Sequence, residues 1–166
     1  MAIVNLNGSK IMTGLAAIPL LVAAPGLNGA VRSWSETIEI GSDDSANSTY
    51  LMARLPSNAR LLGASTISLD DLASAGSPTI DVGVFNLDGK AVITDDDDAI
   101  HSGIDATTEG PLHLIGDIAN YGNKLYEFVD GQTADPLGDL NIVLTLKDAA
   151  VNVGGTVTIE IFYALD

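Results

Sequence analysis

The chain has 166 residues, and its 22 acidic residues against 7 basic ones give a formal net charge of −15. This charge disfavours the phosphate contacts that drive nucleic-acid binding, and it also disfavours anionic membrane surfaces. The absence of cysteine excludes disulfides and thiolate metal sites. Because 46% of the residues are hydrophobic, we expect a protein that buries apolar surface in an assembly and presents carboxylates to water.

The first segment of the chain is apolar. Ile11–Ala24 follows Lys10 and resembles the hydrophobic region of a secretory signal. Glycines and prolines interrupt it, however, well short of the roughly 20 apolar residues that a membrane span needs. We therefore expect a retained, non-spanning arm over residues 1–30 and a single β-domain over residues 31–166.

Ordering such an arm costs roughly 1–2 kcal/mol per residue in backbone entropy, so its apolar side chains must be buried against something. Two locations are open: an end of the same chain's β-domain, or a neighbouring subunit or larger assembly. The apolar composition favours the second. The side chains expected to make these contacts are Ile11, Met12, Leu15, Ile18, Leu20, Leu21, Val22 and Leu27.

After the arm, short segments with alternating apolar residues are separated by turns rich in glycine, proline, asparagine and aspartate. These segments are 32–40, 49–56, 59–69, 79–86, 140–146 and 157–163. Between two of them, Asp88-Gly89 favours a type I′ hairpin turn. Period-two patterning repeated at this spacing predicts an all-β fold, a jelly-roll-like antiparallel β-sandwich of about eight strands.

One stretch has helical rather than strand periodicity. Its residues at helical spacing are Ile118, Tyr121, Leu125 and Phe128. Gly122 lies among them and costs about 1 kcal/mol relative to alanine in a helix. We therefore predict one short helix or helical turn over 123–129, with Gly131 as its C-cap.

Motifs of catalysis are absent from the sequence. It contains no G-x-S-x-G elbow, P-loop or H-E-x-x-H, and His101 and His113 share no metal-ligand spacing. Asp95–Asp98 lacks the alternate ligand spacing of an EF-hand loop, so we expect a solvated acidic loop and no metal site. For a hydrolase, therefore, the sequence offers no identifiable pair of nucleophile and base. A secreted or surface-attached β-sandwich that binds a glycan stays open as an alternative, although only 5% of the residues are aromatic.

A pattern of turns and strand ends extends over nearly the whole chain. It comprises Gly29-Ala30-Val31-Arg32 at the end of the arm, the R-x-P-S-N-A-R strand end from Arg54 to Arg60, the I-D-V-G-V strand from Ile80 to Val84, and a C-terminal series L-Y-E…G…A-D-P…L-T-L…G-G-T…Y from Leu125 to Tyr163. In these residues the chain resembles the head decoration proteins of tailed bacteriophages, also called capsid cement proteins. Tyr126 departs mildly from the tryptophan at this place in the pattern.

The resemblance implies a non-enzymatic virion structural protein without a cofactor. Such a protein would lie on the outer surface of the head, bind and stabilise the shell of phage major capsid protein, and associate with itself as a homotrimer, with a dimer next. The candidate partner-binding residues are the apolar residues of the arm together with Arg32, Arg54 and Arg60. Arg54 and Arg60 are expected to pair with carboxylates, within the chain or between subunits, for which the candidates are Glu36, Glu39, Asp70 and Asp71.

Overall fold

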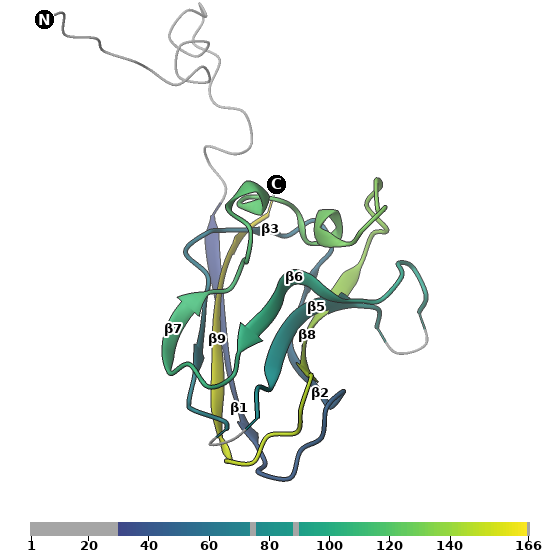
Figure 1. The fold of residues 1–166 in the computed structure, drawn as a ribbon. Helices are drawn as coiled ribbons and strands as arrows, with labels where there is room; N and C mark the ends of the chain where they lie inside the picture. The colour runs from purple at the N-terminus through teal and green to yellow at the C-terminus, as the bar shows by residue number, and fades with distance from the viewer. Residues whose placement is uncertain (1–29, 74–75, 88–89, 166) are drawn as a thin grey trace, which may run out of the picture.

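The computed structural model describes residues 30–73, 76–87 and 90–165 (Figure 1). Over these residues the chain forms strands and two short 3₁₀ turns. The elements are β1 (Val31–Ile40), β2 (Thr49–Pro56), β3 (Arg60–Leu61), β4 (Thr66–Leu69), β5 (Thr79–Phe85), β6 (Asp96–Asp105), β7 (Gly110–His113), η2 (Ile118–Asn120), η3 (Leu125–Phe128), β8 (Asp139–Lys147) and β9 (Gly155–Ala164).

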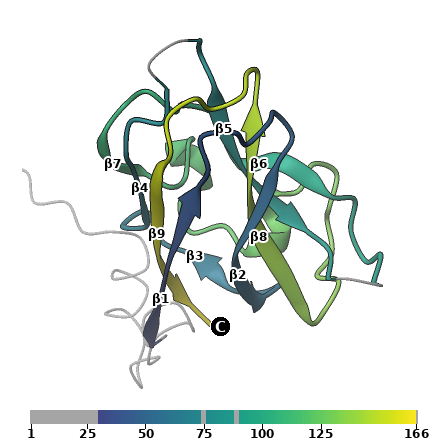
Figure 2. The ribbon, with the colours of Figure 1, turned by 90° about the horizontal axis from the view of Figure 1, so that it is seen from below.

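The strands form two antiparallel sheets that face each other (Figures 1 and 2). Sheet A has the order β1-β9-β4-β7, with the short β3 also paired to β9, and sheet B has the order β2-β8-β5-β6. The chain passes from one sheet to the other at every connection except those from β3 to β4 and from β5 to β6. This order is that of a jelly roll, so the predicted β-sandwich is confirmed.

The core lies between the two sheets and is built from the alternating side chains of the C-terminal strands. Ile142 of β8 and Ile159 of β9 are both fully buried. Five further residues of these strands lie at the alternating positions of the predicted pattern and are also buried: Leu140, Leu144, Leu146, Val157 and Ile161. Trp34 also belongs to the predicted pattern, but its side chain stays 40% exposed while its indole Nε1 donates to the Met52 carbonyl at 2.9 Å.

Strand β8 is buried on both of its faces, which simple alternation does not explain. Its outward residues Asn141, Val143 and Thr145 are each less than 9% exposed. The cause is the start of β6, which lies over the outer face of sheet B. An ideal Cβ at Gly83 of β5 would lie only 2.3 Å from the Asp96 carbonyl oxygen and 2.5 Å from the Asp97 Cα. Glycine at position 83 therefore allows β6 to pass this close.

The sandwich has two distinct ends. At one end, which we call the arm end, β1 begins, Val31 and Arg60 both pair with Ala164, and β3 bonds to the segment after η2 through Leu61 N–H and the Asn123 carbonyl at 3.0 Å. At the other, distal end, four loops meet. These are 41–48, 70–73, 106–109 and 148–154, and backbone hydrogen bonds such as Val151 N–H to the Asp44 carbonyl at 3.1 Å join them.

Three local predictions are corrected. The segment 59–69 is not one strand, because a turn closed by Ser65 N–H and the Leu62 carbonyl separates β3 from β4. The stretch 118–131 forms η2 and η3 in place of a single helix, because Gly122 takes a φ of +83° between them. The C-cap of η3 is Val129 and not Gly131.

The predicted hairpin turn at Asp88-Gly89 falls outside the described residues. The neighbouring described residues 86–87 and 90–95 are not strand, so β5 and β6 are joined by a longer connection than a two-residue turn would give. Among the residues that the structure describes, no helix is long and apolar enough to cross a membrane.

Candidate interaction surfaces

The arm end carries most of the basic side chains of the sandwich. Arg32 lies on β1 opposite Tyr163, Arg54 lies near the end of β2, and Arg60 of β3 forms an isolated bridge with Lys124. The apolar arm residues from Ile11 to Leu27 that were predicted to bind a partner lie outside the described residues. The structure thus brings the three candidate arginines to the end of the sandwich at which residue 30 enters β1.

Among the described residues, Arg54 forms no ion pair with the suggested carboxylates of its own chain, and a pair with another subunit stays a prediction. The Arg54 Nε donates to the Asn141 side-chain oxygen at 3.4 Å. The suggested partners Asp70 and Asp71 belong to the distal end, where they bond the Thr156 and Ala73 amides. Arg60 donates to the carbonyl oxygen of Gly122 and so ties β3 to the turn after η2.

The distal end is strongly acidic. Its loops and the strand ends beside them hold Asp43, Asp44, Asp70, Asp71, Asp105, Glu109 and Asp148. Lys147 at the end of β8 is basic, but the four loops themselves contain no lysine or arginine. Several of these carboxylates are held in the charged form. The Tyr50 hydroxyl lowers the pKa of Asp44, and the backbone amides of Thr156 and Thr107 lower the pKa values of Asp70 and Asp105. This end therefore presents fixed negative charge to its surroundings.

The aspartate run is not the solvated loop that the sequence suggested. Asp96–Asp98 are the first residues of β6, and one carboxylate oxygen from each lies within 4.8 Å of those of the other two. Burial raises the pKa of Asp96 and that of Asp81 on the neighbouring strand β5. Lys147 forms an ion pair with Asp97, which raises the pKa of the lysine. The cluster thus has a cation supplied by the chain itself.

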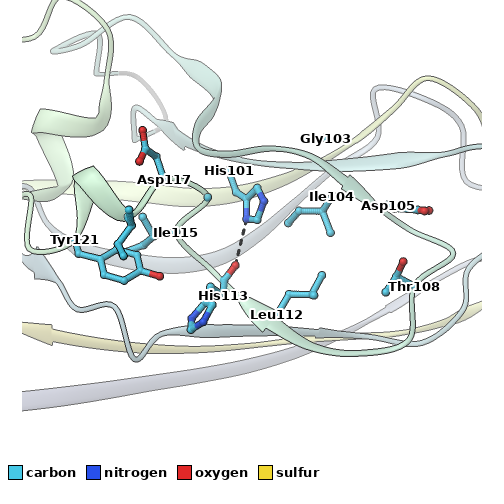
Figure 3. Close-up of a pocket in the computed structure, with 12 residues that line it drawn as sticks. His101, Gly103, Ile104, Asp105, Thr108, Leu112, His113, Ile115, Asp117 and Tyr121 are labelled. Atoms are coloured by element: carbon cyan, nitrogen blue, oxygen red, sulfur yellow. Dashed lines mark hydrogen bonds between the residues drawn. The ribbon is translucent and has the colours of Figure 1, made fainter.

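A groove opens between β6 and β7, which are the edge strands of the two sheets on the side away from β1 and β2 (Figure 3). Its volume is about 600 Å³. Ile104 and Ile115 form a buried floor, and Leu112 is partly buried beside them. Ile118 and Tyr121 form the rim, with 76% and 36% of their surfaces exposed.

Two glycines leave the space that the rings of Tyr121 and His101 occupy in the groove. The Tyr121 ring lies where a Cβ on Gly63 would be, 2.4 Å from its Cδ2 atom, and the His101 ring comes within 2.8 Å of the Cβ position of Gly116. His101 Nδ1 also lies 3.2 Å from the His113 carbonyl oxygen. These contacts fix the walls of the groove in place without a ligand.

The two histidines, far apart in the sequence, are therefore brought together, and sequence reasoning missed this groove. Its residues come from β6, β7 and the segment around η2, so no local motif contains them. The available signal was Ile118, an apolar residue between Asp117 and Asn120 in a segment without strand alternation. We interpreted it as the buried face of a helix, whereas its side chain faces outward.

Comparison of the sequence with models of known protein families finds no match, and comparison with curated proteins finds no significant relative. Solved structures do match. A chain in the capsid of Ralstonia phage GP4 superimposes with a TM-score of 0.58 over 93% of this chain and 94% of its own, at 17% sequence identity. A chain in the capsid asymmetric unit of cyanophage Pam1 gives a TM-score of 0.47 over 90% of this chain and 96% of its own, at 19% identity. The first of these likenesses shows that the chain shares its fold, over nearly its whole length, with a chain of a phage capsid.

Proposed function

We propose that this protein is a structural component of a phage head, a decoration or cement protein that binds the outer surface of the capsid and stabilises the shell of major capsid protein. The observation that carries the proposal is the shared fold over 93% of the chain with a chain of a phage capsid. The sequence resemblance to head decoration proteins points the same way. Such a role needs no catalytic site, only many repeated contacts whose valency lengthens the bound state.

The charge distribution supports one orientation on the shell. The arm end carries Arg32, Arg54 and Arg60, and the apolar arm joins the sandwich there. The distal end carries the fixed carboxylates. We propose that the arm end faces the shell and that the distal end faces solvent, where like charge keeps neighbouring particles apart.

The arm is proposed as the anchor, with its apolar residues from Ile11 to Leu27 buried against a neighbouring subunit or the shell. The subunits are proposed to associate as homotrimers or else as dimers. Closed symmetry is the default for self-association. At about 25 cal/mol per Å², a few hundred Å² of apolar burial by each arm would contribute several kcal/mol per subunit. Part of this is offset by the entropy of ordering the arm.

The test is the occupancy of purified heads by full-length variants. Leu21→Asp places a charge in the proposed apolar contact and should lower occupancy by tenfold or more, because an unpaired charge is costly to bury. Val153→Asp adds the same charge at the exposed distal end and should leave occupancy unchanged. If the unmodified chain does not bind heads at all, the decoration role is wrong. If Leu21→Asp decorates heads as fully as Val153→Asp, the arm is not the anchor.

A further inference from the structure

We infer that the groove between β6 and β7 is the docking site for the apolar N-terminal arm of a second copy of this chain. This inference rests on the proposed arm-mediated assembly and gives that assembly a specific contact. It names the receiving surface, which is defined by Ile104, Leu112, Ile115, Ile118 and Tyr121.

The groove has the chemistry of a site for apolar side chains. Its floor is buried and apolar, and the exposed Ile118 and Tyr121 extend the apolar surface outward. Contiguous exposed apolar surface of this kind marks interaction sites in soluble proteins. The volume of about 600 Å³ is within the range of preformed binding pockets and accommodates several aliphatic side chains.

The charge pattern selects the arm as the occupant. Lys10 is the only charged residue among residues 1–29, so all 22 acidic residues of the chain lie in the remaining part. The net charge therefore opposes contact between two sandwich bodies, whereas an arm brings no carboxylate to its contact with a body. Figure 3 shows Asp117 and Asp105 toward opposite ends of the groove, with Leu112 and Ile104 between them. Lys10 directly precedes the apolar run, so entry of Ile11 and Met12 into the groove would bring a positive charge next to these carboxylates.

The topology favours a second copy over the same chain. The arm joins β1, and the groove borders β7, and these strands are the opposite edges of sheet A. The arm end between them is already filled by β3 and the turn after η2, which are bonded to each other through Gly122 N–H and the Leu61 carbonyl at 2.9 Å. A segment of 29 residues spans up to about 100 Å when extended, whereas three strand spacings are only about 14 Å. The length of the arm therefore permits either its own groove or that of a neighbouring subunit, and it is the filled arm end that favours the neighbour.

The absence of cysteine from the chain makes site-directed cross-linking a direct test. Differently tagged full-length chains are co-expressed, one with Ile11→Cys, Leu15→Cys or Ile18→Cys in the arm and the other with Ile118→Cys. The purified protein is then oxidised. We expect a disulfide-linked pair of unlike chains for at least one arm position. The matched control is Leu137→Cys, whose side chain is 77% exposed, against 76% for Ile118, and does not line the groove.

Every outcome of this experiment bears on the inference. A yield several-fold higher with Ile118→Cys than with Leu137→Cys supports it. Equal yields indicate random collision and overturn it. When both cysteines are placed on one chain, exclusive cross-linking within a monomer shows that the arm fills its own groove, which also overturns it.

A second measurement needs no oxidation. Ile118→Asp should shift the sedimentation-velocity distribution of the full-length protein toward the monomer at a concentration at which Leu137→Asp leaves it unchanged. Because both side chains are exposed, neither substitution should alter the melting temperature much. Equal self-association of the two variants contradicts the inference. Normal cross-linking in a protein that never binds heads leaves this inference standing and refutes the decoration role, so the two failures are distinguishable.

Discussion

The close passage of β6 over β5 leads to a sharp prediction for Gly83→Ala. The new Cβ would lie 2.3 Å from the Asp96 carbonyl oxygen and 2.5 Å from the Asp97 Cα, both of them backbone atoms that cannot rotate away. Overpacking of this kind costs about 1–3 kcal/mol. The loss of glycine's freedom in the unfolded chain offsets only about 0.4–1 kcal/mol. We expect a net destabilisation of roughly 1–2 kcal/mol, the difference between those two effects.

For a domain of this size, 1 kcal/mol corresponds to about 2–4 °C in melting temperature, so Gly83→Ala should melt several degrees below the unmodified protein by circular dichroism. The control is Gly41→Ala, because the Cβ there meets only the Asp44 side chain at 3.5 Å, an ordinary contact. Gly41→Ala should melt at or slightly above the unmodified temperature. Equal melting temperatures for the two variants would show that β6 does not lie over Gly83, and the account of the doubly buried β8 would be wrong.

Three further predictions follow from burial and charge. Ile142→Asp or Ile159→Asp should cost several kcal/mol in the free energy of unfolding, measured by urea titration, because both side chains are fully buried; near-normal stability would place them outside the core. Burial raises the pKa of Asp81, so its charged form is unfavourable, and Asp81→Asn should raise the melting temperature at pH 7 by an amount that vanishes as the pH falls below the folded pKa. The matched control is Asp105→Asn, which removes one negative charge as well. Because hydrogen bonds from Thr107 lower the pKa of Asp105, its charged form is favourable, and Asp105→Asn should melt below Asp81→Asn at pH 7. The reverse order of the two melting temperatures would contradict the assigned shifts. The protein should also fail to retard duplex DNA at neutral pH, since its net charge is −15; retardation that weakens with added salt would refute this.

The sequence was sufficient to predict the sheets because their signal is periodic. The alternation of apolar residues from Leu140 to Leu146 and from Val157 to Ile161 requires one face of each strand to be buried. Two sheets that pack face to face bury the apolar faces of both strands. Local signals were less reliable where tertiary contacts compete with them. The described residues on either side of Asp88-Gly89 are joined as a tight turn would join them, by Lys90 N–H and the Leu87 carbonyl at 2.9 Å. They are not strand, however, because β5 ends at Phe85 and β6, which passes over Gly83, begins only at Asp96.

The surfaces could be predicted less well than the core. The composition shows that the chain has an excess of apolar residues, but it does not show which of them stay exposed. Ile115 is buried and Ile118 is exposed, although they are only three positions apart, because the chain turns between them. The groove joins an edge strand of each sheet, so it exists only once both sheets are assembled. The pairing of Arg54 with Asp70 within the chain could not be judged from the sequence for the same reason: the two residues are 16 positions apart yet belong to opposite ends of the sandwich.

The pairing of β1 with β9 also governs how the chain reaches its fold. β9 lies between β1 and β4 in sheet A, and β8 lies between β2 and β5 in sheet B, yet β8 and β9 come later in the chain than every strand that they join. A growing polypeptide can form the β5–β6 ladder early. By contrast, β2 has no neighbour in its own sheet until β8, which begins at Asp139, and β1 has none until β9, which begins at Gly155. Such distant pairing makes folding slow. A nascent chain that stalls before Gly155 has an apolar arm and a β1 without its partner strand, and it is therefore prone to aggregate. We expect both sheets to form only after the last two strands have been translated.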